Sequence, residues 1–417
     1  MSERIEIAVV GAGVIGLAIA YRLAIGGREV MILDPEPPGS GASYGNAGTI
    51  ADYAVQPVGT PGVLRNLPSL LFDKTSPLAI RRAALPTLAP WLMRFARQSL
   101  PAAARRNAVT LAGLLADAAP RWRDLAIEIG AAGLMQDRGC LYLYEHLNHR
   151  RAAEADIAFR KDLGITVEML SSDELAKLEP GLPLMDGGGA YFPQALFMTD
   201  PGRMVAALAT AARAAGVQFR KARVDHLQRD SGRVSLSGAG LSLVADRVVL
   251  AAGAHSRALA RQAGDRVPLE TERGYHVEYD MKTPRLSRPS CPTSRGFYMC
   301  PMAGRLRVAG TVELGGLTAP ASQHRIDQLD KGARAIFADL PPPSRSWMGF
   351  RPSLPDSLPV IGASCAGPDV IHAFGHGHIG LTLAPATAAI VEGILSANDP
   401  NAAGNALGPG RFRGIFA

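Results

Sequence analysis

Residues 5–34 contain the pattern that most constrains the fold of this chain. A β-branched run, Ile5 to Val10, leads into Gly11-Ala12-Gly13-Val14-Ile15-Gly16 and a helical pattern that reaches Gly26. A second apolar run at 29–33 ends at Asp34. A bare G-x-G-x-x-G is a weak signal, but strand, glycine turn, helix, strand and acid in this order are typical of a dinucleotide-binding Rossmann unit. The sequence therefore predicts an α/β fold with a parallel sheet and a bound dinucleotide.

Each residue of this pattern has an expected physical task. Gly11 permits a tight turn, Gly13 lets a diphosphate approach the backbone, and Gly16 lets the helix pack closely on the strand. The helix N-terminus offers N–H donors and a partial positive charge to the diphosphate. Asp34 is expected to accept hydrogen bonds from the adenosine ribose, and its charge disfavours a 2′-phosphate.

Three later segments bear on which dinucleotide is bound, since FAD and NAD share this fingerprint. Residues 38–48 are small and include Ser43 and Asn46, which suit a loop around a diphosphate or an isoalloxazine edge, although a plain loop is the alternative. Residues 247–256 suggest a buried strand that ends in small residues. Residues 369–374 run into Gly-His-Gly-His-Ile-Gly-Leu-Thr, and a helix is expected from about Ala384. A second helix N-terminus behind a glycine-rich loop suits the electron-rich end of a second ligand moiety.

Composition restricts the class of protein. The 417 residues are 47% hydrophobic and 19% charged, which is typical of a globular enzyme of two or three domains. No stretch of ~20 apolar residues predicts a spanning helix, and the polar start predicts no signal peptide. The 4 cysteines lie far apart without zinc-ligand spacing. We therefore expect no metal site and a reducing, cytoplasmic location.

The segment 65–106 is strongly basic. It contains Arg65, Lys74, Arg81, Arg82, Arg94, Arg97, Arg105 and Arg106 with a single acid, Asp73, so it carries the whole net charge of +7. Basic and large apolar residues together indicate either a surface that docks on a membrane or partner, or a solvated face of helices whose other side is core. Nucleic-acid binding is not expected, because no aromatic-basic strand or recognition-helix pattern accompanies the charge.

These segments, in this order, resemble the FAD-dependent amine oxidoreductase family, which includes D-amino acid oxidase, glycine and sarcosine oxidases and bacterial D-amino acid dehydrogenase. Asn46-Ala47-Gly48 and the Thr-Pro-Gly at 60–62 are most similar to the D-amino acid dehydrogenase branch. The resemblance spans nearly the whole chain and is weakest at 61–189.

The resemblance implies two discontinuous domains. A Rossmann-like FAD-binding domain is expected at 1–60, 199–265 and 345–417. A substrate domain whose antiparallel sheet roofs the flavin is expected at 61–198 and 266–344. No cysteine stands at a flavin-tethering position, so FAD is expected to be non-covalent.

Four residues are expected to serve catalysis. A buried guanidinium holds a carboxylate with two parallel hydrogen bonds, and Arg351 matches the family's Gly-(Phe/Leu)-Arg-Pro arginine that does this; pairing with Asp356 is the alternative. Tyr275, on the expected roofing strand, is a candidate donor to the substrate or simply a sheet aromatic. His378 is a candidate contact to cofactor or substrate, and Tyr53 is expected to close the pocket.

The residues expected to contact FAD belong to the segments described above. They are Gly11, Gly13, Val14, Ile15, Gly16, Asp34, Pro35, Ser43, Asn46, Ala47, Gly48, Val224, Ala252, Gly253, Gly349, Gly377, His378, Ile379, Gly380, Leu381 and Thr382.

The implied activity is oxidative deamination, with hydride transfer from substrate Cα to flavin N5. Three alternatives remain: a D-amino acid dehydrogenase that passes electrons to a quinone or another carrier, an oxidase of glycine, sarcosine or D-amino acids, and a flavin subunit of a larger complex. For the first, the substrate is D-alanine-like, D-proline or cis-4-hydroxy-D-proline, and segment 65–106 is a candidate peripheral membrane contact. Arg351 does not distinguish D from L substrates.

Overall fold

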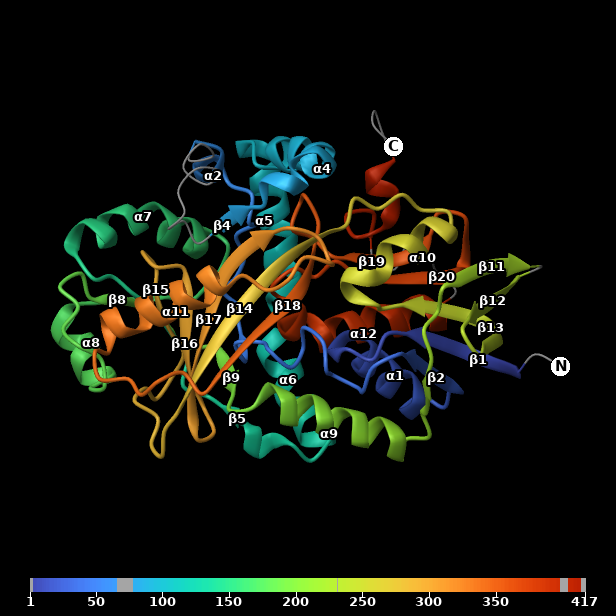
Figure 1. The fold of residues 1–417 in the computed structure, drawn as a ribbon, viewed down its shortest axis with the longest axis horizontal. Helices are drawn as coiled ribbons and strands as arrows, with labels where there is room; N and C mark the ends of the chain where they lie inside the picture. The colour runs from blue at the N-terminus through green and yellow to red at the C-terminus, as the bar shows by residue number, and fades with distance from the viewer. Residues whose placement is uncertain (1–2, 66–77, 231, 398–403, 414–417) are drawn as a thin grey trace.

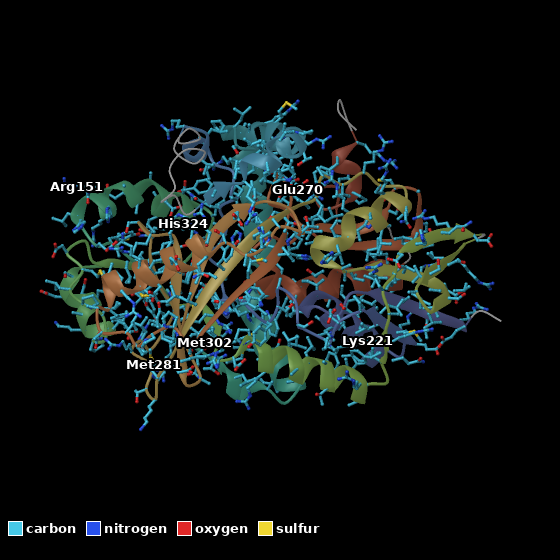
Figure 2. The ribbon with its side chains drawn as sticks, viewed as in Figure 1. Arg151, Lys221, Glu270, Met281, Met302 and His324 are labelled. Carbon is cyan, nitrogen blue, oxygen red and sulfur yellow. The ribbon has the colours of Figure 1, made fainter. Side chains whose placement is uncertain are left out.

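Two β-sheets organise the structure and lie side by side along its long axis (Figure 1). The computed structural model describes residues 3–65, 78–230, 232–397 and 404–413. The basic segment 65–106 is therefore described at Arg65 and from residue 78 onward, and its middle part lies outside the described residues. In Figure 2, Lys221 belongs to the unit of the first sheet and Arg151 lies on the outer helix of the opposite unit.

The first sheet contains the predicted dinucleotide-binding pattern. Its main path runs β10-β2-β1-β13-β12-β11, with β20 beside β13 and β19 beside β20. Pairings β10/β2, β2/β1, β1/β13 and β13/β20 are parallel. The strands are β1 (Glu3–Val10), β2 (Val30–Asp34), β10 (Gln218–Lys221), β11 (His226–Asp230), β12 (Arg233–Gly238), β13 (Leu241–Leu250), β19 (Val360–Ser364) and β20 (Gly367–Phe374).

Both faces of this sheet are buried, as the continuous apolar run of β1 predicts. Ile7 and Val9 belong to the core formed with the helices on one face, whereas Ala8 and Val10 belong to the core on the other face. Helices α1 (Val14–Ile25), α9 (Pro201–Ala214) and α12 (Gly380–Ala397) cover the first face, and α10 (Ser256–Gln262) covers the second. Asp200 caps the start of α9, because its side chain accepts a hydrogen bond from the Arg203 N–H at 3.0 Å.

The second sheet is the roof expected from the sequence. It runs β18-β14-β17-β16-β15-β6-β8-β7, with β4 beside β17, and its central pairs β18/β14/β17/β16 are antiparallel. The strands are β4 (Leu78–Ile80), β6 (Cys140–Leu143), β7 (Glu168–Leu170), β8 (Gly189–Phe192), β14 (Glu270–Asp280), β15 (Ser290–Pro292), β16 (Phe297–Met302), β17 (Arg305–Leu314) and β18 (Arg345–Ser353).

Helices pack around this roof and join it to the first unit (Figure 1). A small sheet, β3-β9-β5, lies at the junction. These elements are β3 (Thr49–Ile50), β5 (Met135–Gln136), β9 (Leu196–Met198), α2 (Pro61–Arg65), α4 (Leu85–Gln98), α5 (Pro101–Leu115), α6 (Ala118–Glu128), α7 (Leu147–Asp162), α8 (Ser172–Leu178) and α11 (Gln323–Ile336). None of the described helices is long and apolar enough to cross a membrane.

Two sequence expectations need correction. Residues 345–353 were assigned to the FAD-binding domain, but β18 pairs with β14 along its whole length and belongs to the roof. The last helix starts at Gly380 rather than near Ala384, because Pro385 fits within its second turn. The other domain boundaries stay predictions.

Candidate functional site

A cavity of about 1010 Å³ is lined by both sheets and gathers the predicted site residues. Small-molecule pockets measure roughly 300–1,000 Å³, so this one suits a large, elongated ligand. All the predicted catalytic and cofactor-binding residues line it except Gly16 and Gly48. These two glycines pack against the backbone outside the cavity. A Cβ atom at Gly16 would lie 1.9 Å from the Gly11 oxygen, and one at Gly48 would lie 2.7 Å from the Met198 oxygen.

The three glycines of the first turn have different structural demands. Gly11 has φ +113°, and a Cβ there would lie 2.4 Å from the carbonyl oxygen of Ala251. Gly16 brings α1 against the turn and confirms the expected close packing. At Gly13, by contrast, a Cβ would meet only the Ser43 hydroxyl, at an ordinary 3.5 Å. The fold itself therefore requires Gly11 and Gly16, whereas Gly13 leaves space in the cavity wall.

Asp34 holds the backbone at this end of the cavity. Its Oδ2 accepts a hydrogen bond from the Ala12 N–H at 2.7 Å, and its Oδ1 accepts from the Glu36 N–H at 2.8 Å. An ionised carboxylate has about four acceptor sites, so both oxygens retain capacity for ligand hydroxyls. The predicted ribose contact therefore remains compatible with this second, structural role.

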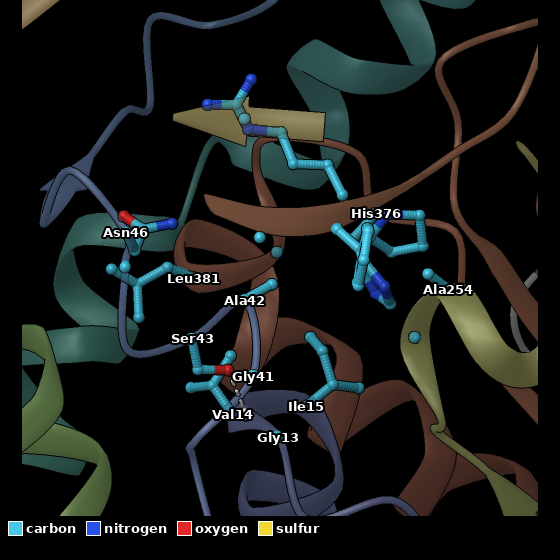
Figure 3. Close-up of a pocket in the computed structure, with 18 of the residues that line it drawn as sticks. Gly13, Val14, Ile15, Gly41, Ala42, Ser43, Asn46, Ala254, His376 and Leu381 are labelled. Atoms are coloured by element: carbon cyan, nitrogen blue, oxygen red, sulfur yellow. Dashed lines mark hydrogen bonds between the residues drawn. The ribbon is translucent and has the colours of Figure 1, made fainter. Parts of the chain in front are cut away.

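The segment 38–48 folds over the N-terminus of α1. The Ser43 hydroxyl accepts a hydrogen bond from the Val14 N–H at 3.0 Å, and Figure 3 shows its side chain directed at this turn. The Asn46 Oδ1 accepts from the Gly48 N–H at 2.8 Å, which closes a local turn. Ser43 thus satisfies one of the free N–H groups of the helix end while its own proton stays available to a ligand.

The roof fixes this segment through its backbone. The buried Arg307 donates from Nη1 to the carbonyl oxygens of Tyr44 at 3.2 Å and Asn46 at 2.6 Å, and Glu278 balances its charge at 2.7 Å. His276 Nδ1 contacts the Gly45 carbonyl oxygen at 3.1 Å. Burial and the charge of Arg307 lower the pKa of His276 to about 4, so this histidine is neutral and structural.

The second glycine-rich loop ends in a helix start that faces the cavity. Pro385 has no N–H, so the Leu381 carbonyl lacks the partner that lies four residues on in a regular helix. The buried Trp122 indole supplies a donor to that carbonyl at 2.8 Å. The Thr382 hydroxyl accepts a hydrogen bond from the Ala51 N–H at 3.1 Å, which links this helix start to the residue that follows β3. Leu381 and His376 both border the cavity in Figure 3.

Arg351 extends into the cavity from β18. Its guanidinium occupies the space beside Gly274, where a Cβ would lie 2.4 Å from Cζ. Its Nη1 donates to the Thr311 carbonyl oxygen at 3.4 Å. The alternative partner, Asp356, is bonded to Arg411 at 2.8 Å instead. Burial lowers the pKa of Arg351, and the charge of Glu272 partly offsets this effect.

Thr311 marks an irregularity in the roof beside Arg351. The β14/β17 register shifts between Gly274 and Tyr275, and Thr311 has φ +56°, an unusual value for a β-branched residue. Its buried hydroxyl has no hydrogen-bond partner in the part of the chain that the structure describes. Bulges of this kind redirect a strand next to functional sites.

Tyr275 uses its hydroxyl within the roof in this structure, and its role towards the substrate stays a prediction. Its hydroxyl donates to Glu313 Oε2 at 2.7 Å and accepts from the Ser322 N–H at 3.2 Å. The single phenolic proton is therefore used within the roof, and only the body of the residue borders the cavity. A sequence pattern shows which strand face a tyrosine occupies but not where its hydroxyl finds a partner.

Tyr53 forms part of a fixed wall rather than closing the pocket. It is 0% exposed and stacks on Phe192 with ring centroids 4.2 Å apart. Its hydroxyl lies 3.1 Å from Cys140 Sγ and 3.3 Å from the Tyr298 hydroxyl. Burial raises the pKa of Tyr53 well above its usual value, so its phenol stays protonated.

His378 is exposed to the cavity, as the sequence predicts. Desolvation by the surrounding protein and the charge of Arg351 lower the pKa of His378 to about 4. His376 contacts the Thr387 hydroxyl at 3.0 Å, and burial lowers its pKa to about 3. Both imidazoles are therefore neutral near pH 7.

Sequence reasoning missed four cavity residues: Gln56, Tyr142, Arg160 and Tyr298. Arg160 belongs to α7, whose many charged residues suggest a solvent-exposed helix, yet Arg160 is only 6% exposed. An isolated arginine within such a helix carries no local signal of burial. Only the contact of α7 with the roof reveals it.

The arrangement fits FAD. The cavity has the start of α1 with the space at Gly13 near Asp34, and the start of α12 with Arg351 on the roof side. The start of α1 would hold the diphosphate, and the start of α12 would lie beside the flavin ring. Within residues 3–65, 78–230, 232–397 and 404–413, no cluster of His, Cys, Asp and Glu is suited to a metal ion.

Comparisons with known proteins agree with this geometry. A family model described as FAD dependent oxidoreductase matches residues 6–392. A D-amino-acid oxidase from Bradyrhizobium diazoefficiens is 35% identical over 99% of this chain and 100% of that protein. A D-amino acid dehydrogenase from the same organism is 29% identical over 99% and 100% of the two chains.

Solved structures share the fold. Glycine oxidase from Geobacillus kaustophilus superposes with a TM-score of 0.76 at 24% identity over 95% of both chains. L-proline dehydrogenase from P. horikoshii superposes with a TM-score of 0.75 at 18% identity over 99% of this chain and 98% of that one. At these identities the likeness concerns the fold alone.

Proposed function

The chain belongs to the family of FAD-dependent oxidoreductases, and from this premise we propose that it oxidises the Cα–N bond of a D-amino acid or cyclic D-imino acid. The observation that carries the proposal is Arg351, an always-charged guanidinium in the cavity whose recorded hydrogen bond is a long one to a carbonyl oxygen. Such a group suits the α-carboxylate of an amino acid. The names of the similar proteins from Bradyrhizobium diazoefficiens supply the D configuration.

FAD would be held non-covalently by the turn at 11–16, Asp34, Ser43 and the loop 377–382. When bound, it supplies the two-electron acceptor for a hydride that leaves the substrate Cα. The backbone N–H groups at the start of α12 would stabilise negative charge that develops on the ring. The imine product then hydrolyses in water.

The protein's own residues would orient the substrate rather than exchange protons with it. Arg351 fixes the α-carboxylate and thereby the direction of the Cα–H bond. The substrate amine enters neutral, so no general base is required. This agrees with a site whose phenols have raised pKa values and whose His378 has a pKa lowered to about 4.

For the electron acceptor we propose a quinone or another carrier, which makes the protein a dehydrogenase. The relatives named D-amino acid dehydrogenase support this choice. An oxygen-using oxidase is the second candidate, favoured by the 35% identical relative named D-amino-acid oxidase. With either acceptor, D-alanine-like compounds, D-proline and cis-4-hydroxy-D-proline are candidate substrates. A flavin subunit of a larger complex is the remaining alternative.

The described part of segment 65–106 supports a peripheral membrane contact. Helices α4 and α5 and the junction between them expose Met93 and Leu100 together with Arg97, Arg105 and Arg106. No acidic residue occurs between 85 and 116. We expect binding to anionic but not to neutral lipid vesicles, measured by sedimentation. Equal binding to both, or none, would contradict this contact. The cytoplasmic location stays a prediction.

Anaerobic visible spectra of the purified protein test the main proposal. D- and L-alanine, both prolines, cis-4-hydroxy-D-proline, glycine and sarcosine are added one at a time. We expect a D-compound to bleach the flavin, with slow recovery in air and fast recovery with a dye or quinone. Fast recovery in air would favour the oxidase. Bleaching by no compound would shift the assignment to a complex subunit, and a protein that takes up no FAD would refute the function.

A further inference from the structure

A second arginine borders the substrate end of the cavity. Arg160 donates from Nε to Asp156 Oδ2 at 3.0 Å, and from Nη1 to the Tyr53 carbonyl oxygen. A guanidinium has five N–H donors, so these two contacts leave donors for a ligand. Asp156 Oδ1 is buried and has no hydrogen-bond partner among the described residues, so this ion pair is a single-point contact rather than a bidentate one.

Phenols surround this guanidinium. Its Cζ lies 5.5 Å from the ring centre of Tyr142 and 5.9 Å from that of Phe192. The Tyr298 hydroxyl lies 3.3 Å from both the Tyr142 and the Tyr53 hydroxyls. Burial raises the pKa of Tyr142 to about 12, and that of Tyr298 well above its usual value. These phenols therefore remain neutral hydrogen-bonding groups throughout the physiological range.

The charges along the cavity are unevenly distributed. The acidic residues that line it are Asp34, Glu36 and Asp225, all on the first-sheet unit. At the roof end, Arg351 and Arg160 line the cavity with no acidic lining residue between them, and His378 is neutral. Asp156 offsets the Arg160 charge through a single contact, so both guanidinium groups keep N–H donors for a carboxylate.

Arg351 and Tyr298 border the same short stretch of β17. Arg351 contacts the carbonyl of Thr311, and Tyr298 on the adjacent strand pairs with Ala309, two residues from Thr311. Adjacent strands lie about 4.8 Å apart, and two residues span about 7 Å along a strand. When the α-carboxylate of a substrate binds Arg351, the side chain of that substrate can therefore reach Tyr298 and Arg160.

We propose that Arg160, Tyr142 and Tyr298 form a side-chain subsite, and that the preferred substrates are D-amino acids with a side-chain carboxylate, such as D-aspartate or D-glutamate. This inference rests on the proposed function, because Arg351 must bind the α-carboxylate. A side-chain carboxylate would accept hydrogen bonds from Arg160 and the Tyr142 phenol, which Tyr298 positions, whereas an amide of the same shape lacks the charge.

Steady-state kinetics with matched substrates test the subsite. For the wild type we expect kcat/KM for D-aspartate or D-glutamate to exceed that for D-asparagine or D-glutamine by at least tenfold. Arg160→Met should bring this acid-to-amide ratio near 1, mainly through KM. Arg150 lies on the same helix and donates to the Leu170 and Gly187 carbonyls without lining the cavity, so Arg150→Met should keep the ratio.

A second variant tests the same subsite in case Arg160→Met fails to fold. Asp156→Asn removes the carboxylate that competes for Arg160, so we expect the acid-to-amide ratio to rise. An equal ratio in the wild type, or a ratio that neither variant changes, would overturn the subsite. If D-alanine still bleaches the flavin, the proposed function survives that result. If no D-amino acid bleaches it, the proposed function fails first.

Discussion

The two ends of the cavity are built in different ways. The dinucleotide end is largely local in sequence: Gly11, Gly13, Gly16 and Asp34 lie within one strand-helix-strand unit, and small residues line much of it. The substrate end combines Tyr53, Tyr142, Arg160, Tyr298 and Arg351, which come from distant parts of the chain. Backbone geometry is encoded by short patterns, whereas a side-chain cluster depends on tertiary packing. The predictions below test how far this contrast extends.

Gly16→Ala and Gly13→Ala should separate fold from ligand binding at the dinucleotide end. At Gly16 the new Cβ would lie 1.9 Å from the Gly11 oxygen, so we expect little folded protein. At Gly13 the fold accommodates a Cβ, so we expect a folded protein whose FAD affinity falls at least tenfold. Circular dichroism and flavin absorbance measure the two effects. Wild-type FAD affinity in Gly13→Ala would show that no diphosphate approaches this residue.

Arg351→Met should produce the largest kinetic loss at the substrate end. Removal of one partner from a buried charged pair costs about 4 kcal/mol, which is roughly 10³-fold in kcat/KM. FAD content should remain unchanged, because the first unit supplies the diphosphate cradle. Arg345→Met on the same strand is the control, since the Arg345 side chain is half-exposed and does not line the cavity. Normal turnover in Arg351→Met would refute the anchor.

The same contrast explains what the sequence could and could not predict. The strand, turn and helix at 5–26 and the second strand ending at Asp34 follow from local patterns and agree with the structure. The start of α12 was misplaced because Trp122, far away in sequence, compensates for Pro385. Arg160 was missed because its helix has the composition of a surface helix. In each failure a tertiary partner decided the outcome.

Acidification should weaken the contact between the two ends through His276. Its pKa is lowered from 6.5 to about 4 in the folded protein, so the unfolded chain binds more protons between these values. The stability contribution is therefore full above pH 6.5 and declines as the pH falls towards 4. From these two pKa values we expect a loss of about 2 kcal/mol between pH 7 and pH 5 from this residue.

Urea unfolding of the wild type and His276→Gln at the two pH values measures this contribution. Glutamine retains an N–H donor for the Gly45 carbonyl but does not titrate, so the loss should shrink in the variant. An equal loss in both proteins would assign the pH dependence to other groups, such as His376 and His378, whose pKa values are also lowered.

Tyr275→Phe should have the smallest effect on catalysis, although the residue borders the cavity beside Arg351. Its hydroxyl is bonded to Glu313 and to the Ser322 N–H, so its removal leaves the substrate contacts unchanged. The loss of a buried hydrogen bond should lower the free energy of unfolding by about 1–2 kcal/mol. We expect kcat/KM to change less than about threefold. A large kinetic loss at unchanged stability would instead mean that the phenol turns towards the substrate during the reaction, and the substrate end would then depend on movement as well as on packing.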